Sequence, residues 1–137
     1  MPTSHVEKQI LRWWPSAVTL GAVLWLTLAP EPLGEIEPPG FLGPYADKVV
    51  HFIMFGGLTG AIVFDIVRAG MRLDLLRKAV LVVAMTAFAA ADEWAQGAMH
   101  IGRTADILDL AADTAGILTA IVIAPPLCRH LLHRHRR

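Results

Sequence analysis

The sequence predicts an all-α fold: an integral membrane bundle of four transmembrane helices, with both termini in the cytoplasm. Three observations support this. The 137 residues are 55% hydrophobic, with a mean hydropathy of +0.51, whereas a soluble domain is about 45–50% apolar. The apolar residues collect in four segments that approach the roughly 20 residues needed to cross a bilayer. Most of the lysines and arginines lie before the first segment, between the second and third, and after the fourth. These positions share one side of a chain that crosses the membrane four times.

The four apolar segments are predicted membrane spans. In chain order they cover about residues 14–29, 49–67, 78–98 and 107–124. The first is the shortest, and Trp13 and Trp14 at its start suit an anchor at the membrane interface. Lys8 and Arg12 precede it, as in a signal peptide. No clear small-x-small cleavage signal follows, so we retain the segment as a span.

The remaining spans have features of helices that pack closely in lipid. In the second span, Gly56 and Gly60 form a small-xxx-small pair, which lets helix backbones approach each other. The third span is rich in alanine and should pack in the same way. Pro125 and Pro126 should end the fourth span, because proline lacks the N–H that a helix interior needs. We find no internal repeat and no second domain, so residues 1–137 are predicted to form a single membrane domain.

Positive charges fall almost entirely on one side of this four-span arrangement. Ten of the twelve lysines and arginines share that side: Lys8, Arg12, Arg68, Arg72, Arg77, Lys78, Arg129, Arg134, Arg136 and Arg137. Only Lys48 and Arg103 fall on the other side. Positively charged segments tend to stay in the cytoplasm, so both termini are predicted to be cytoplasmic and residues 30–44 external.

Carboxylates occur inside the predicted spans, where ionised groups are costly and usually serve a function. Asp106, Asp109 and Asp113 step by three and four residues, which places them on one face of a helix. Glu93 and Gln96 are three residues apart on the preceding span and also share a face. The two polar faces should form two walls of one site.

The alternating topology brings these faces to the start of the second span, where Asp47 and His51 share a face. We therefore predict one ligand pocket in the external half of the bundle, open outward unless residues 30–44 cover it. Its predicted lining is Asp47, Lys48, His51, Glu93, Gln96, Arg103, Asp106, Asp109 and Asp113. His51, Glu93 and Asp109 should lie within mutual reach, directly or through one water or ion. Asp92 is left out because it points about 100° away from its neighbour Glu93.

These polar residues fall into an ordered set of short motifs. In chain order the motifs are Asp47-Lys48-x-x-His51-Phe52, Glu93-x-x-Gln96, Arg103, Asp106, Asp109 and Asp113-x-x-Gly116. The set resembles the VanZ-like family of small bacterial integral membrane proteins over about residues 47–120. One position departs from the family pattern, which often has Asn where this chain has Asp113. The resemblance implies a multi-pass protein of the bacterial cytoplasmic (inner) membrane. The family's namesake is linked to teicoplanin resistance, so the resemblance implies an envelope role more than a particular reaction.

Two classes of function fit this pocket. In the first, which we favour, it binds or handles an outer-leaflet lipid, a lipid-linked molecule or a peptidoglycan precursor, with Lys48 and Arg103 holding an anionic headgroup. In the second, the chain is an intramembrane metal-dependent hydrolase of a lipid phosphate or ester. Its metal ligands would be His51, Glu93, Asp109 and Asp113. No known ligand motif and no nearby Ser or Cys nucleophile supports the hydrolase. An ion or proton pathway is disfavoured, because the inner halves of the spans carry no continuous polar chain.

The charge balance of the pocket leads to a further expectation. Four carboxylates would face only two firm cations, and such a surplus does not persist in a dry site. We expect a proton on Asp109 or Asp113 to relieve it, with no metal and no cofactor. Expected partners are membrane lipids, including anionic lipid at the basic C-terminal tail, and a lipid-linked envelope precursor. A homo-oligomer fits so small a bundle, and no nucleic-acid partner is expected. Asp65 should pair with a local arginine.

Overall fold

The computed structural model describes residues 13–29, 45–99 and 105–134, and all the regular structure in these ranges is helical. The helices are α2 (Trp14–Leu28), α3 (Ala46–Arg68), α4 (Leu75–Met99) and α5 (Ile107–Arg134). The predicted all-α class is confirmed, and each helix covers one of the predicted spans. The external segment 30–44, Arg103 and both chain ends lie outside the described residues.

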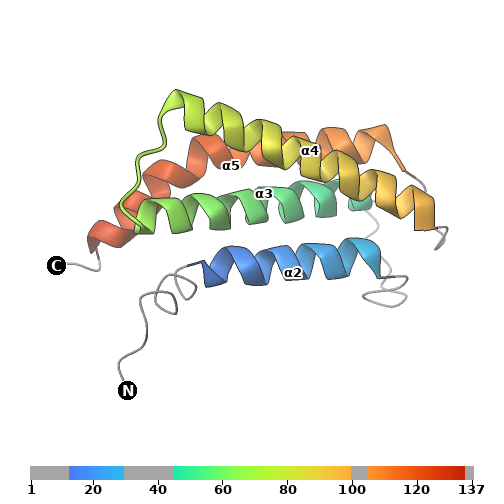
Figure 1. The fold of residues 1–137 in the computed structure, drawn as a ribbon, viewed down its shortest axis with the longest axis horizontal. Coiled ribbons are helices and arrows are strands. Elements are labelled where there is room, and N and C mark those ends of the chain that lie inside the picture. The colour runs from blue at the N-terminus through green and yellow to red at the C-terminus, as the bar shows by residue number, and fades with distance from the viewer. Residues whose placement is uncertain (1–12, 30–44, 100–104, 135–137) are drawn as a thin grey trace, which may run out of the picture.

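The helices lie side by side and alternate in direction (Figure 1). The start of α2 meets the end of α3, where the Ser16 N–H and hydroxyl donate to Asp65 Oδ2 at 3.1 and 2.6 Å. The C-terminal part of α5 reaches the same end, because Arg68 and Arg129 line one cavity of about 640 Å³. The start of α3, the end of α4 and the start of α5 therefore share the opposite end. The predicted site residues lie at that end.

The last helix is longer than predicted. Pro125 and Pro126 lie inside α5, which continues to Arg134, so the prediction that they end it was wrong. Each proline removes only its own N–H from the helix ladder. Burial of Pro125 and Cys128 keeps the following turns packed against the bundle. Neighbouring helices commonly let proline stay within an apolar helix in this way.

The polarity of the bundle is inverted relative to that of a soluble protein. Val83, Trp94 and Val122 are 68%, 73% and 70% exposed, whereas His51 and Asp113 are 2% and 0% exposed. Large apolar surfaces of this kind mark contact with a membrane or a partner. Two segments, Ala46–Arg68 and Ile107–Leu132, are long and apolar enough to cross a bilayer. Helix α2 is apolar but has 15 residues, about 22 Å at 1.5 Å per residue.

Helices α3 and α5 are in backbone contact where two glycines meet. A Cβ on Gly116 would clash with the carbonyl oxygen of Phe52 and lie 3.0 Å from the Gly56 nitrogen. We expected Gly60 to line a close helix contact together with Gly56. A Cβ added at Gly60 would have nothing within 4 Å. The close approach is thus made by Gly56 and Gly116. It holds His51 and Asp113, each within about one and a half turns of these glycines, in neighbouring positions.

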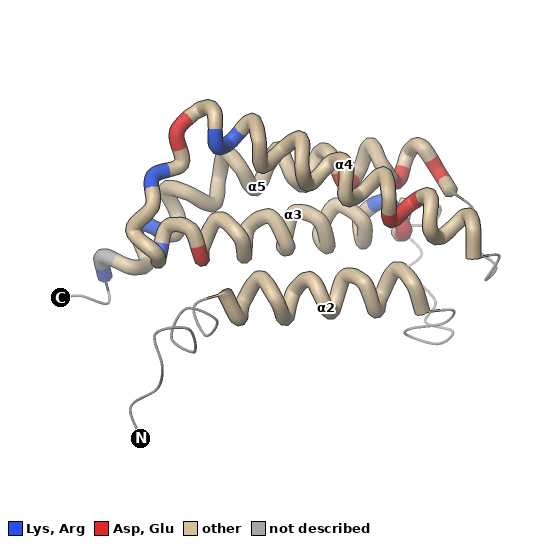
Figure 2. Tube along the Cα trace, in the orientation of Figure 1, with Lys and Arg blue, Asp and Glu red and all other residues tan. Residues whose placement is uncertain are grey.

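Charges are separated along the long axis of the bundle, as Figure 2 shows. Apart from Lys48, all the described lysines and arginines belong to the end where α3 finishes and α4 begins, or to the last turns of α5: Arg68, Arg72, Arg77, Lys78, Arg129 and Arg134. Most of the carboxylates gather at the other end. The expected pairing of Asp65 with a local arginine is confirmed, because Arg68 Nη2 lies 3.0 Å from Asp65 Oδ1.

Candidate functional site

The candidate site is a buried polar cluster between α3, α4 and α5. Its innermost members, His51, Glu93, Asp109 and Asp113, are 2%, 6%, 5% and 0% exposed. Its outer members, Asp47, Lys48 and Asp106, are exposed or half-buried. The cluster thus has two levels: an outer rim of Asp47, Lys48 and Asp106, and a floor of His51, Glu93 and Asp113. The buried Asp109 connects the two levels, since it is bound by Lys48 of the rim and lies near His51 of the floor.

Lys48 on α3 holds two carboxylates, Asp109 in α5 and Asp106 directly before that helix. Its Nζ lies 2.7 Å from Asp106 Oδ2 and 2.8 Å from Asp109 Oδ1. Arg103, the other cation that the sequence places in this pocket, lies outside the described residues. Among the described residues, Lys48 holds both carboxylates. Its hydrogen bond to Asp106 lowers the pKa of that carboxyl below its usual range.

Asp106 also organises the backbone at the start of α5. Its Oδ1 accepts a hydrogen bond of 2.8 Å from the Leu108 N–H, which is how an N-cap carboxylate satisfies the free amides of a helix start. Its own N–H donates to Glu93 Oε2 at 3.0 Å. One residue thus joins α5 to Lys48 on α3 and to Glu93 on α4.

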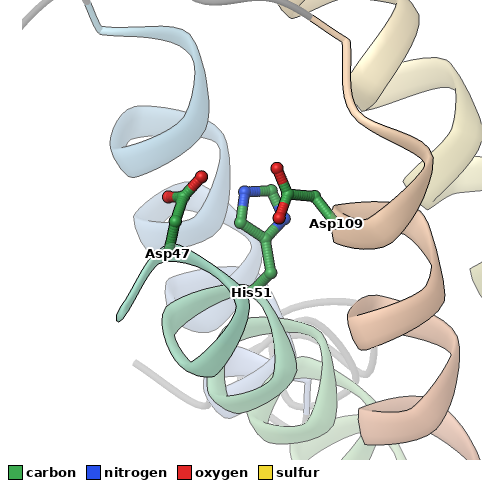
Figure 3. A group of neighbouring side chains, drawn as sticks. All are labelled: Asp47, His51 and Asp109. Atoms are coloured by element: carbon green, nitrogen blue, oxygen red, sulfur yellow. The ribbon is translucent and has the colours of Figure 1, made fainter. Parts of the chain in front are cut away.

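His51 is the meeting point of the floor. Its Nδ1 lies 3.0 Å from Asp113 Oδ1 and 3.7 Å from Glu93 Oε1. Asp47 and Asp109 also offer oxygens near this ring, with the donor atoms of the three residues within 4.8 Å of one another. Figure 3 shows Asp47 and Asp109 on opposite sides of the imidazole. His51 therefore lies near both Glu93 and Asp109, as expected of it, and also near Asp113.

Two oxygens of the floor lack a hydrogen-bond donor. Glu93 Oε1 and Asp113 Oδ2 are buried and have no hydrogen-bond partner among the described residues. Buried polar atoms are nearly always paired, and an orphan one calls for an explanation such as an ion or a functional role. These oxygens are the feature of the cluster that most directly suggests a bound cationic or donor group.

Gln96 belongs to a neighbouring network instead of the floor. Its Nε2 donates to Asp92 Oδ2 at 3.1 Å, and Thr27 Oγ1 donates to Asp92 Oδ1 at 2.9 Å. Asp92, which we left out of the site, is 5% exposed and ties α4 to α2. The sequence carried one signal for this hydrogen bond. The i,i+4 spacing of Asp92 and Gln96 places both side chains on one helix face.

Comparison with known proteins gives one result. The model of the VanZ/LLP1 family matches residues 4–129. No curated protein and no solved structure matches the chain.

Proposed function

The chain belongs to the VanZ/LLP1 family, and from this premise we propose that it is a multi-pass protein of the bacterial cytoplasmic membrane that handles an envelope molecule. Family membership fits an envelope protein associated with teicoplanin resistance. The inverted polarity of the bundle supports a membrane location. The observation that carries the function is the buried acidic cluster with a single described cation, Lys48, at one end of an apolar bundle.

The proposed topology has four spans and places the acidic cluster outside the cytoplasm. All the described cations except Lys48 lie toward the other end. By the positive-inside rule that end faces the cytoplasm. The rim of the cluster would then meet the outer leaflet, where envelope precursors are displayed.

Accessibility of single cysteines tests this topology. With Cys128→Ser as background, intact cells are treated with a membrane-impermeant maleimide. Tyr45→Cys, at an exposed position beside the cluster, should be labelled at once. Met71→Cys, at an exposed position of the basic end, should react only after lysis. The reverse pattern would place the cluster on the cytoplasmic side and rule out an outer-leaflet ligand.

The proposed ligand combines an amine- or hydroxyl-bearing headgroup with an apolar chain. Asp47 and Asp106 on the rim can accept hydrogen bonds from such a headgroup, and charge-assisted hydrogen bonds of this kind are strong. Lys48 can contact a phosphate on the same ligand. An apolar groove of about 260 Å³ is lined in part by Phe52, Gly56 and Gly116, of which Phe52 follows His51 in the chain. An acyl or prenyl chain fits there. The ligand class that combines these features is a lipid-linked peptidoglycan precursor or a similar outer-leaflet lipid.

Binding to a defined precursor tests the proposal. The full chain in lipid nanodiscs should bind a polyprenyl-diphosphate disaccharide pentapeptide more tightly than phosphatidylglycerol, as measured by native mass spectrometry. Asp47→Asn should weaken the binding by about tenfold, the loss expected when one hydrogen bond to a charged group is removed. Asp47 is exposed, so the substitution should leave the fold intact.

The matched control is Asp74→Asn, which changes an exposed carboxylate at the opposite end of the bundle. It should bind the precursor like the wild-type chain. Expression of the wild-type chain in a teicoplanin-sensitive host should also raise the inhibitory concentration more than expression of Asp47→Asn. Equal binding of the precursor and phosphatidylglycerol, or equal binding by Asp47→Asn and wild type, would refute the proposed ligand.

A further inference from the structure

Three donor atoms from three helices converge at the floor of the cluster. They come from His51 on α3, Glu93 on α4 and Asp113 on α5, one ring nitrogen or carboxylate oxygen from each, and all lie within 4.8 Å of one another. Imidazole nitrogen and carboxylate oxygen are the donors that bind zinc and similar divalent cations. Sites with three protein ligands keep a fourth position for water or another group.

The separations match the spacing that such an ion requires. Tetrahedral ligands at about 2.0–2.1 Å from a metal lie about 3.3–3.4 Å from one another. His51 Nδ1 lies 3.0 Å from the Asp113 oxygen and 3.7 Å from the Glu93 oxygen, on either side of that value. Each of these two separations is within about 0.4 Å of the tetrahedral value.

The unsatisfied hydrogen-bonding capacity of the floor is a second observation that points to a cation. Glu93 Oε1 and Asp113 Oδ2 are buried without a hydrogen-bond partner among the described residues. Lys48, the described cation nearest to them in the fold, is already held by Asp106 and Asp109. A divalent ion between Glu93 and Asp113 would bind both carboxylates. It would also offset the negative charge that Lys48 does not neutralise.

A proton, which the sequence led us to expect, would serve this floor less well. A proton would neutralise one of the two carboxylates and leave the other ionised in a buried place, where an uncompensated charge is costly. A single cation satisfies both residues at once, because both carboxylates face the same imidazole nitrogen.

The surroundings of His51 fit a ligating histidine. Such a histidine usually donates its other ring N–H to a carboxylate, which fixes the ring orientation. Asp47 and Asp109 supply carboxylates around this ring (Figure 3). We propose that His51, Glu93 and Asp113 form a binding site for one divalent cation of the zinc class. The inference does not depend on which envelope molecule the rim binds.

Zinc titration of the full chain in detergent tests the site. His130→Gln, His133→Gln and His135→Gln are introduced first as a background, so that the tail histidines do not compete. The metal-depleted background protein should bind one zinc ion by calorimetry. Its melting temperature should rise with zinc and fall again with chelator, because a ligand that binds only the folded state stabilises it by mass action.

Variants of the floor separate this site from other zinc binding. Glu93→Gln and Asp113→Asn should each weaken zinc binding by at least about 100-fold, since even the loss of a group that only orients a ligand costs 10–100-fold. Asp92→Asn, a buried carboxylate held by Gln96 and Thr27 in the neighbouring network, is the matched control and should retain zinc within a few-fold. X-ray absorption at the zinc edge should show one nitrogen among oxygen ligands at about 2.0–2.2 Å.

Three results would overturn the inference: no saturable zinc binding by the background protein, unchanged zinc affinity in both floor variants, or an equal loss in Asp92→Asn. If either floor variant fails to fold, His51→Gln provides a further test, with the absorption spectrum losing its nitrogen ligand or binding being lost altogether. Precursor binding is not used as a readout, so a failure here leaves the proposed function standing, and the reverse also holds.

Discussion

Gly116→Ala is expected to destabilise the bundle by about 3 kcal/mol, at the upper end of the cost of overpacking. The new methyl group would clash with the Phe52 carbonyl oxygen and lie 3.0 Å from the Gly56 nitrogen. Backbone atoms cannot rotate away as a side chain can, so α3 and α5 must move apart. Separation of these helices also pulls His51 away from Asp113. Thermal unfolding in detergent should therefore show a lower midpoint, and zinc should stabilise this variant less than the wild-type chain.

Gly57→Ala is the matched control for this effect. It adds the same methyl group to α3, at a position with nothing within 4 Å. Since alanine favours a helix by about 1 kcal/mol over glycine, this variant should be as stable as the wild type or slightly more stable. If Gly116→Ala and Gly57→Ala unfold alike, the close α3–α5 contact does not hold the bundle together.

Lys48→Met is expected to lower the melting temperature by about 5 °C or more. A shift of this size is typical when a chain of this length loses a substantial part of its free energy of unfolding. The substitution keeps most of the side-chain volume and removes the ammonium group that lies 2.7 and 2.8 Å from Asp106 and Asp109. Asp109 is then a buried carboxylate without its cation, which is more costly than removing both partners. Glu93 and Asp113 nearby add to the repulsion.

A double-mutant cycle tests whether Lys48→Met loses stability through the uncompensated charge of Asp109 or through general damage to the fold. Asp109→Asn in the Lys48→Met background should restore part of the lost stability, because the uncompensated charge is gone. Lys48→Arg keeps the positive charge and should melt closer to the wild type than Lys48→Met does. Additive losses for Lys48→Met and Asp109→Asn would show that the two residues do not interact in the folded protein.

Helical spacing allowed the elements and most of the floor to be predicted. The apolar runs indicated four helices, and the described ranges contain four helices over the corresponding residues. Steps of three and four residues placed Asp109 and Asp113 on one face of a helix, and the alternating order of the helices put His51 and Glu93 at the same end. These predictions needed only the periodicity of a single helix and the number of times the chain reverses.

The tertiary structure decided which of these residues pair. Periodicity gives the direction of a side chain around its own helix axis, whereas partners depend on how far each helix is rotated and shifted against its neighbours. The sequence alone therefore did not show that Lys48 would hold Asp109, that Gln96 would turn to Asp92, or that Gly116 would pack on Gly56. Those outcomes depend on the shapes of facing side chains, above all on the two glycines that let α3 and α5 touch. That contact joins glycines 60 residues apart in the chain, and no pattern within a single helix predicts it.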